Sequence, residues 1–309
     1  MLFRSLVTGV GLCLPQLGPH VRADIIAEFA RRAEAMGYEA LWVQDHFMYP
    51  EKPIRGYGGT DRMPPHQYKS VFAPTETLAF VAGITSKVRL GTSILVAGNH
   101  WPVPLAQRLA TIDQMCNGRL IVGLGVGWNA EEHSASGTEI ETRGRRMDDF
   151  IPAMLACWQE DPVSYDGPIF SIPSSFVSPK PVQNPRPKLL SGMWSADGMA
   201  RTAKWFDAWN PAGMPIGKVQ KIVAGLNEQR SAEQMPLEIY YRSFIQGPLA
   251  PRAADGDNMA ALIADATACR EAGFVELTLE HNFWQDIKKP EDWLDVPERF
   301  LPVVEAARG

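Results

Sequence analysis

The chain has 309 residues, of which 45% are hydrophobic and 21% are charged, and its formal net charge is −5. These fractions are typical of a folded globular protein and exclude a disordered chain. Because the balance is mildly acidic and Lys and Arg form no run, we expect no nucleic-acid partner and no membrane partner, but a small-molecule substrate.

The cysteines indicate a reducing compartment. The 4 cysteines are far apart and form no Cys-x-x-Cys pair, which excludes zinc-ribbon and thioredoxin-type sites. We therefore expect buried thiols and a cytoplasmic protein. No apolar stretch reaches the roughly 18 residues that span a bilayer. Gly9, Gly11 and Pro15 interrupt the first apolar run, which we interpret as a buried strand, with a secretion signal as the less favoured alternative.

Short apolar runs alternate with longer amphipathic stretches along the whole chain. In residues 24–36, for example, apolar side chains recur at helical spacing up to Gly37, which is predicted to end the helix. The predicted strands are 6–14, 38–43, 88–96, 120–125, 187–192, 206–209, 237–245 and 274–279. The predicted helices are 24–36, 75–85, 104–115, 143–159, 196–204, 216–230, 258–272 and 290–307.

This alternation predicts an α/β fold with a parallel sheet, and its repeating units fit a (β/α)₈ TIM barrel. A doubly wound sheet is the alternative. No low-complexity linker divides the chain, so we expect a single domain over residues 1–309. Two connections exceed the usual βα length of about 2–6 residues. These insertions follow strands 2 and 4, at 45–74 and after Gly127 including 162–185, and are predicted to wall a substrate pocket at the barrel mouth.

Two polar residues directly follow the second predicted strand. Asp45 and His46 would lie at the carboxyl end of that strand, where barrel enzymes hold their active sites. Histidine gains and loses a proton near neutral pH, so His46 is the candidate for proton transfer. The alternative is a pair that only caps the loop by hydrogen bonds to backbone.

Two glycine-containing turns are further candidates. Gly123-Leu-Gly-Val-Gly127 closes a strand, and its glycines would let a planar ring or a phosphate approach the backbone. Its spacing is not the dinucleotide-binding G-x-G-x-x-G, and packing is the alternative explanation. Ser191-Gly-Met-Trp-Ser195 precedes a predicted helix, so it forms either an anion site or an ordinary turn with Ser195 or Asp197 as N-cap.

Tryptophans gather after predicted strands, which favours a flat aromatic ligand over simple packing. They are Trp101, Trp128, Trp194 and Trp284. Hydrolytic chemistry is not indicated, because the chain lacks a G-x-S-x-G elbow and a P-loop. Its 6 histidines lack metallohydrolase spacing, so no metal site is expected. Glu131-Glu132-His133 is interpreted as a solvated loop or the start of a helix.

Five segments carry a resemblance to a known family. They are Gly37-Tyr-Glu-Ala-Leu-Trp-Val-Gln-Asp-His46, Val88-Arg-Leu-Gly-Thr-Ser-Ile-Leu-Val96, Leu105-Ala-Gln-Arg-Leu-Ala-Thr-Ile-Asp113, Asn117-Gly-Arg-Leu-Ile-Val-Gly-Leu-Gly-Val-Gly-Trp128 and Phe206-Asp-Ala-Trp-Asn-Pro211. With them the chain resembles the bacterial luciferase-like flavin oxidoreductases, over nearly its whole length. The patterns around His46 and Trp128 look most like the branch that uses the deazaflavin coenzyme F420.

The resemblance implies a (β/α)₈ barrel that binds F420, or alternatively FMN, at its mouth. It implies that His46 lies near the reactive ring carbon and Asp45 contacts the ring system. A non-prolyl cis peptide at Ser93–Ile94 would form a bulge behind the central ring. The remaining expected cofactor contacts are Gly125, Gly127 and Trp128 at the ring, and Gly192, Met193 and Trp194 at the phosphate, although the usual Gly-Gly is not intact.

The expected function is hydride transfer between F420 and a small, hydrophobic or planar organic substrate. Trp128 stands where the sugar-phosphate dehydrogenases of this branch carry a catalytic Glu, which argues against a sugar phosphate. The alternatives are an FMN-dependent monooxygenase, which would need O₂ and a flavin reductase as partner, and a flavin-binding protein without turnover. A homodimer is also expected, through apolar residues of the second and third predicted helices: Leu78, Phe80, Val81, Leu105, Leu109 and Ile112.

Overall fold

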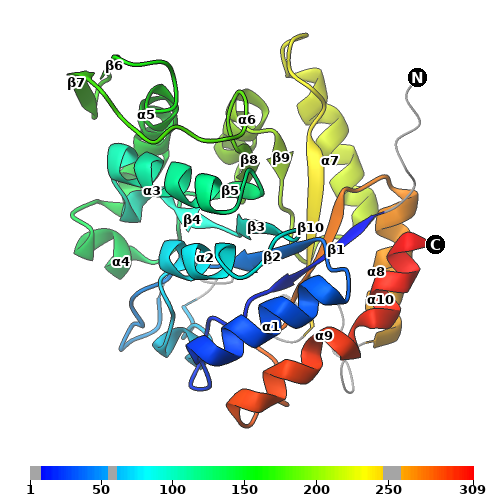
Figure 1. Cartoon of the computed structure of the whole chain (residues 1–309). Coiled ribbons are helices and arrows are strands. Elements are labelled where there is room, and N and C mark those ends of the chain that lie inside the picture. The colour runs from blue at the N-terminus through cyan, green and yellow to red at the C-terminus, as the bar shows by residue number, and fades with distance from the viewer. Residues whose placement is uncertain (1–7, 55–60, 246–258) are drawn as a thin grey trace.

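The computed structural model describes residues 8–54, 61–245 and 259–309. In these ranges parallel strands form a barrel that is surrounded by helices (Figure 1). The sheet closes on itself, because β3, at one end of the strand order, also pairs with β5 near its other end. The predicted TIM barrel is confirmed, and the doubly wound alternative is wrong.

Eight strands make up this barrel in the described part of the chain, and each corresponds to a predicted strand. They are β1 (Gly9–Cys13), β2 (Ala40–Val43), β3 (Arg89–Thr92) continued by β4 (Leu95–Val96), β5 (Leu120–Gly125), β8 (Lys188–Ser191), β9 (Ala208–Trp209), β10 (Glu238–Phe244) and β11 (Glu276–Glu280). Residues 6 and 7 of the first predicted strand lie outside the described residues.

The first seven predicted helices are present with small shifts at their ends, the short α4 is an additional helix, and the last predicted helix is divided. The described ranges contain ten α-helices. They are α1 (Ala23–Ala35), α2 (Pro74–Ala82), α3 (Pro102–Met115), α4 (Ala130–Ala135), α5 (Arg143–Ala156), α6 (Ala196–Trp205), α7 (Ile216–Glu228), α8 (Met259–Glu271), α9 (Val296–Arg299) and α10 (Leu301–Arg308). The described ranges also contain the 3₁₀ turns η2 (His66–Lys69), η3 (Ala97–Asn99), η4 (Ile140–Thr142) and η5 (Pro290–Asp295). Residue 258 of the predicted helix 258–272 lies outside the described residues.

Two local predictions about helices have different outcomes. Gly37 follows α1 with φ = +82°, a left-handed conformation that favours glycine, so the predicted end of this helix is confirmed. The single helix predicted over 290–307 is wrong, because the segment divides into η5, α9 and α10. Pro297 and Pro302 lie in the first turns of α9 and α10, where the N–H that proline lacks would have no partner within the helix, whereas inside one continuous helix each would remove a hydrogen bond.

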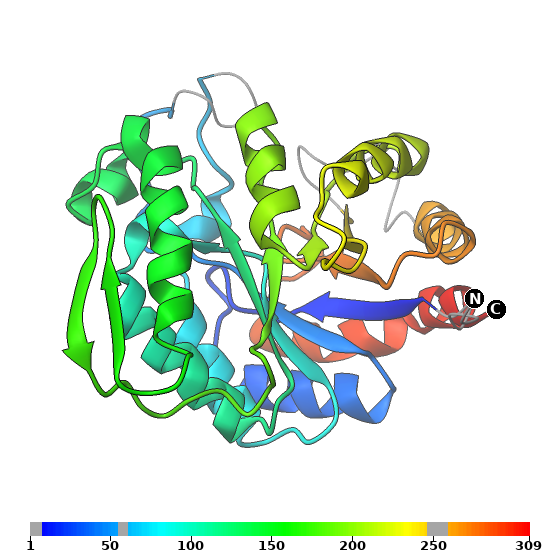
Figure 2. The same cartoon turned by 90° about the horizontal axis from the view of Figure 1, so that it is seen from above.

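The second predicted insertion does not lie where the sequence suggested. Residues 162–185 follow helix α5 rather than a strand, and form an antiparallel hairpin of β6 (Val163–Asp166) and β7 (Ser171–Ser175). Figure 2 shows this hairpin beside α5, outside the barrel. After it, the amide of Val182 bonds to the Asp113 carboxylate near the start of β5. The prediction that 162–185 walls a pocket at the mouth is wrong.

The apolar faces of α2 and α3 are used inside the chain. Leu78, Val81, Leu105 and Leu109 are at most 1% exposed, and Ile112 is also buried, whereas Phe80 is 44% exposed. The expectation that these faces are left over for a dimer interface is therefore wrong for all but Phe80. The homodimer itself stays a prediction. Among the described helices, none combines the length and apolar character needed to cross a membrane.

Candidate active site

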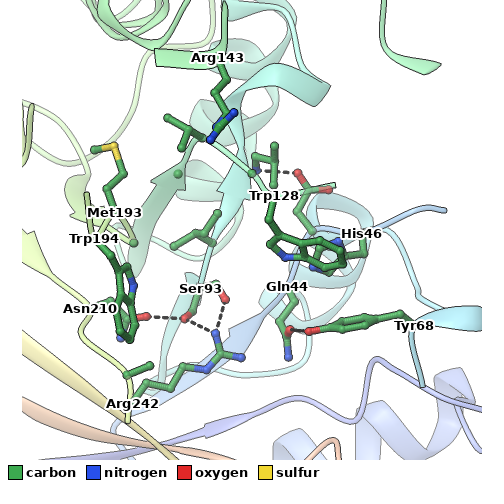
Figure 3. A pocket seen from close by; sticks show the side chains of 18 of the residues that line it. Gln44, His46, Tyr68, Ser93, Trp128, Arg143, Met193, Trp194, Asn210 and Arg242 are labelled. Atoms are coloured by element: carbon green, nitrogen blue, oxygen red, sulfur yellow. Dashed lines mark hydrogen bonds between the residues drawn. The ribbon is translucent and has the colours of Figure 1, made fainter. Parts of the chain in front are cut away.

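A cavity of about 550 Å³ opens at the carboxyl ends of the barrel strands (Figure 3). This volume lies in the range of about 300–1,000 Å³ that is typical of small-molecule sites. The sequence analysis placed ten residues at a cofactor or substrate, and all ten line the cavity: Asp45, His46, Ser93, Ile94, Gly125, Gly127, Trp128, Gly192, Met193 and Trp194. It missed further lining residues, which include Gln44, Tyr68, Arg143, Asn210, Ala212, Arg242, Phe244 and Phe283. The chemical roles of the ten stay predictions.

His46 leaves the end of β2 with its ring held on three sides. Its Nδ1 lies 3.1 Å from Oε2 of Glu132. Its ring centroid is 4.4 Å from that of Tyr68 and 5.0 Å from that of Trp128. A carboxylate oxygen accepts hydrogen bonds, so a hydrogen bond at this contact requires a hydrogen on Nδ1, and Nε2 would then be the ring nitrogen left to exchange a proton with a ligand.

Glu132 is a site residue that the sequence analysis missed. It lies in the first turn of α4, where the side chain of Asn129 accepts hydrogen bonds from the amides of Glu131 and Glu132. The start of a helix is therefore confirmed, but the solvated interpretation is wrong for Glu132 and His133, which are each 1% exposed, and holds only for the exposed Glu131. The N-cap residue Asn129 three positions before a Glu was the available sequence signal for an ordered first turn.

Asp45 connects the ends of two barrel strands. Its Oδ2 accepts a hydrogen bond of 2.9 Å from the amide of Val96 and lies 2.8 Å from Nε2 of His100. The adjacent residues Asp45 and His46 thus belong to two separate acid–histidine pairs. Asp45 holds the chain that follows β4, and its predicted contact with a ring system remains to be tested.

The peptide bond Ser93–Ile94, between β3 and β4, is cis, so the predicted cis bond is confirmed. Ile94 lies against two of the predicted glycines. A Cβ atom on Gly125 would lie 2.7 Å from Cδ1 of Ile94, and one on Gly192 would lie 2.7 Å from its Cγ2. On Gly127, whose φ is +77°, it would lie 2.5 Å from Cγ1 of Val96. The chain's own side chains therefore require these glycines, while the approach of a ring to them stays a prediction.

The floor of the cavity is polar and charged. Nη1 of Arg242 donates to the carbonyl of Ser93 at 2.8 Å and to its Oγ at 3.1 Å, and this hydroxyl donates to Oδ1 of Asn210 at 2.7 Å. Nη2 of Arg242 pairs with Glu280, which also accepts from Nε2 of Gln44 at 2.6 Å. Burial alone would lower the pKa of Arg242 and raise that of Glu280. Their mutual attraction outweighs burial, so each pKa moves in the direction that keeps the pair charged.

The far wall of the cavity is formed by the turn between β8 and α6. Figure 3 shows Met193 and Trp194 opposite His46 and Trp128, with Arg143 at a third side. Oγ of Ser195 accepts from the amide of Gly198 at 3.1 Å, which confirms Ser195 as the N-cap of α6. The anion site predicted for this turn is untested, but the cation Arg143 lines the same cavity.

The four tryptophans predicted to gather at one ligand have different surroundings. Trp128 and Trp194 line the cavity. Trp101 is 60% exposed and packs against Phe170, whereas Trp284 is buried. Neither Trp101 nor Trp284 is among the lining residues, so two of the four tryptophans lie at the cavity, and the flat aromatic ligand stays a prediction.

Comparison with known proteins gives a family and a set of relatives. Residues 9–300 match the sequence model of a family described as luciferase-like monooxygenase. An F420-dependent glucose-6-phosphate dehydrogenase of Kineococcus radiotolerans is 31% identical over 163 residues, 51% of this chain and 44% of the relative. An FMNH₂-dependent dimethylsulfone monooxygenase of Pseudomonas putida is 31% identical over 189 residues, 59% of this chain and 48% of the relative.

Solved structures agree with the fold. An F420-dependent secondary alcohol dehydrogenase, in complex with an F420–acetone adduct, superposes with a TM-score of 0.71 at 18% sequence identity. The superposition covers 96% of this chain and 99% of the other. At this identity, the likeness shows a common barrel and no more.

Proposed function

The chain belongs to the luciferase-like monooxygenase family, and we propose that it transfers a hydride between coenzyme F420 and a small, hydrophobic or planar organic substrate. Relatives named as F420-dependent dehydrogenases support the cofactor. The observation that carries the proposal is the arrangement of His46. Its Nδ1 is held by the buried carboxylate of Glu132 at 3.1 Å, and the side chain lines the cavity at the barrel mouth.

The residues present fit a ring cofactor with an anionic chain. Ile94, seated against Gly125 and Gly192, gives the cavity an apolar wall against which a flat ring packs. Arg143 and the N-terminal end of α6 supply a charge and a helix dipole suited to a phosphate. When bound, F420 supplies or accepts the hydride, and the protein must handle the proton.

His46 is the proposed proton-transfer residue. Reduction of a carbonyl group to an alcohol consumes one hydride and one proton, and oxidation of the alcohol releases both. In its neutral form, with hydrogen on Nδ1, His46 accepts the alcohol proton at Nε2; in its protonated form it donates that proton to the carbonyl oxygen. The carboxylate of Glu132, 3.1 Å from Nδ1, favours the positive charge that the ring carries between these steps.

The aromatic residues at the cavity indicate the substrate class. Phe244 and Phe283 are nearly parallel, with ring centroids 6.1 Å apart and planes at 15°. Tyr68 meets the edge of Phe283 at 5.5 Å, and all three line the cavity. Apolar faces of this kind bind hydrophobic or planar molecules by dispersion and the hydrophobic effect.

Titration with both cofactors tests the proposal. We expect fluorescence titration to show tighter binding of F420 than of FMN. Micromolar binding of FMN without any binding of F420 would overturn the cofactor assignment. Binding of F420 without turnover of any alcohol or carbonyl compound would favour a flavin-binding protein that is not an enzyme.

FMN-dependent monooxygenation is the second candidate, supported by the relatives named as FMNH₂-dependent dimethylsulfone monooxygenases. This reaction needs O₂ and a source of reduced FMN, for which the protein would depend on a flavin reductase. The test supplies reduced FMN and measures oxygen consumption with and without substrate. Substrate-dependent oxygen consumption with formation of an oxygenated product would establish this second function.

A further inference from the structure

We propose that Glu132 is a positioning residue that sets which ring nitrogen of His46 bears the hydrogen and points the other toward the substrate. The inference rests on the proposed proton-transfer role of His46. Glu132 lies 86 positions along the chain from His46. In the fold it is the acidic partner of His46, whereas the neighbouring Asp45 is bound to the Val96 amide and paired with His100.

The hydrogen-bond contacts of the Glu132 carboxylate, with two backbone amides and with the ring of His46, show how it can orient that ring. Oε1 accepts hydrogen bonds from the backbone amides of Phe47 at 2.9 Å and Met48 at 3.2 Å. Nδ1 of His46 lies 3.1 Å from Oε2 and 3.3 Å from Oε1. Backbone amides can only donate, so Oε1 acts as an acceptor. With Oε2 as a second acceptor, a neutral His46 ring needs a hydrogen on Nδ1 to complete the hydrogen bond.

The backbone of Glu132 is fixed, so its carboxylate acts as a rigid reference point. The side chain of Asn129 caps α4 through the amides of Glu131 and Glu132. His133, the next residue, lies 3.0 Å from the carbonyl of Val126 through Nε2 and 3.0 Å from Oγ1 of Thr138 through Nδ1. This turn is held at Asn129 and at His133, and from this we infer that Glu132 keeps its place while the imidazole of His46 adjusts to it.

The same carboxylate also fixes the chain that carries His46. Its bonds to the amides of Phe47 and Met48 hold the backbone immediately after the histidine. Tyr68 and Trp128 restrict the ring from two other directions. Glu132 therefore controls both the position and the tautomer of His46. Both serve catalysis in the same way, because they leave Nε2 free to exchange a proton with the substrate.

The tautomer is read directly by ¹⁵N NMR of histidine-labelled protein without cofactor, at alkaline pH. The His46→Ala variant identifies the His46 signals among those of the 6 histidines. We expect hydrogen on Nδ1 in the unmodified protein. In Glu132→Gln the amide group can donate to Nδ1, and we expect the hydrogen to move to Nε2. Hydrogen on Nε2 in the unmodified protein, or the same tautomer in both proteins, would overturn the inference.

Activity provides a second arm, with the exposed neighbour Glu131 as matched control. We expect Glu132→Gln to lower kcat by about 10²-fold or more, with KM and cofactor Kd within about twofold, and Glu132→Asp to restore part of the loss. Glu131→Gln should match the unmodified protein. A Glu132→Gln enzyme with unchanged kcat would contradict the inference. Because the NMR arm needs no cofactor, absence of F420 turnover would contradict only the proposed function.

Discussion

Strand β11 places two glutamates inside the same barrel, one near each end, and their surroundings differ. Glu276 and Glu280 are both fully buried. At the amino-terminal end, Glu276 accepts from Nε1 of Trp42 at 2.6 Å and from Oγ1 of Thr278 at 2.9 Å, and pairs with Arg89 at 3.1 Å. At the carboxyl end, Glu280 pairs with Arg242 beneath the cavity.

Burial raises the pKa of both carboxyl groups, but the opposing cations differ in strength. The side chain of Arg89 is 29% exposed, so water screens its charge, and the pKa of Glu276 stays above its ordinary value. Arg242 is 11% exposed and lowers the pKa of Glu280 below its ordinary value. Among the described residues, Nε of Arg242 has no hydrogen-bond partner. At the amino-terminal end of the barrel, the network of Glu276 therefore has a structural role. Below the proposed active site, the Arg242–Glu280 pair is charged and one of its buried hydrogen-bond donors has no partner in the described ranges.

The largest expected difference between the two ends of the barrel is in kcat. We expect His46→Ala to lower turnover by about 10²–10⁴-fold while the cofactor Kd changes little, because the residue exchanges a proton rather than holding the ring. Glu276→Gln, at the other end, serves as control and should leave kcat within about twofold. Steady-state kinetics and fluorescence titration measure both. An unchanged kcat in His46→Ala would contradict the proton-transfer role and favour the alternative, in which the residue only caps the loop.

Replacement of Arg242 should destabilise the protein more than replacement of Arg89. Arg242→Met leaves Glu280 buried without its counter-charge, and we expect the free energy of unfolding to fall by about 3–5 kcal/mol. Arg89→Met should cost less, about 1–3 kcal/mol, because Glu276 keeps two hydrogen bonds and takes up a proton more readily. Urea unfolding at neutral pH measures both losses. An equal or larger loss for Arg89→Met would contradict the assignment of the stronger ion pair to Arg242.

The two glutamates should also give opposite pH dependence. The depressed pKa of Glu280 stabilises the folded protein above the ordinary value of 4.5, and this contribution is lost as pH falls through the lower folded value. The raised pKa of Glu276 contributes stability below 4.5, which is lost as pH rises through the higher folded value.

Unfolding of Glu280→Gln and Glu276→Gln across acidic pH tests these signs. Relative to the unmodified protein, Glu280→Gln should become less stable as pH rises from the acid side toward 4.5. Glu276→Gln should become more stable as pH rises above 4.5. If the free energy of unfolding changed with pH in the same way in both variants, the two glutamates would not differ in their electrostatic environment.

The smallest expected effect lies outside the barrel, at the proposed dimer surface. Phe80 is 44% exposed and Phe72 is 39% exposed, and both line a groove between α1 and α2. We propose a homodimer that covers them, and expect Phe80→Ala to raise the dimer dissociation constant about tenfold through lost apolar burial. Light scattering measures the mass of both proteins. A single species of 34.2 kDa at micromolar concentration would contradict the dimer.

The local patterns of the sequence were sufficient for most of the fold. Short apolar runs predicted every barrel strand, because a strand that is buried on both faces is apolar along its length. The position of His46 at a barrel mouth followed from its place directly after β2. The hairpin of β6 and β7 was misplaced because its prolines and polar residues indicate a loop, without showing which end of the barrel it joins.

The sequence by itself therefore determined the barrel, the end at which its site lies and ten residues of the cavity lining. Only the tertiary structure decided the pairs: His46 with Glu132, Asp45 with His100, and Arg242 with Glu280. Parallel strands bring all their carboxyl ends to one face, whatever their separation along the chain. Which side chains meet there depends on strand register and on how each loop returns, and those are set by packing between distant segments rather than by local pattern.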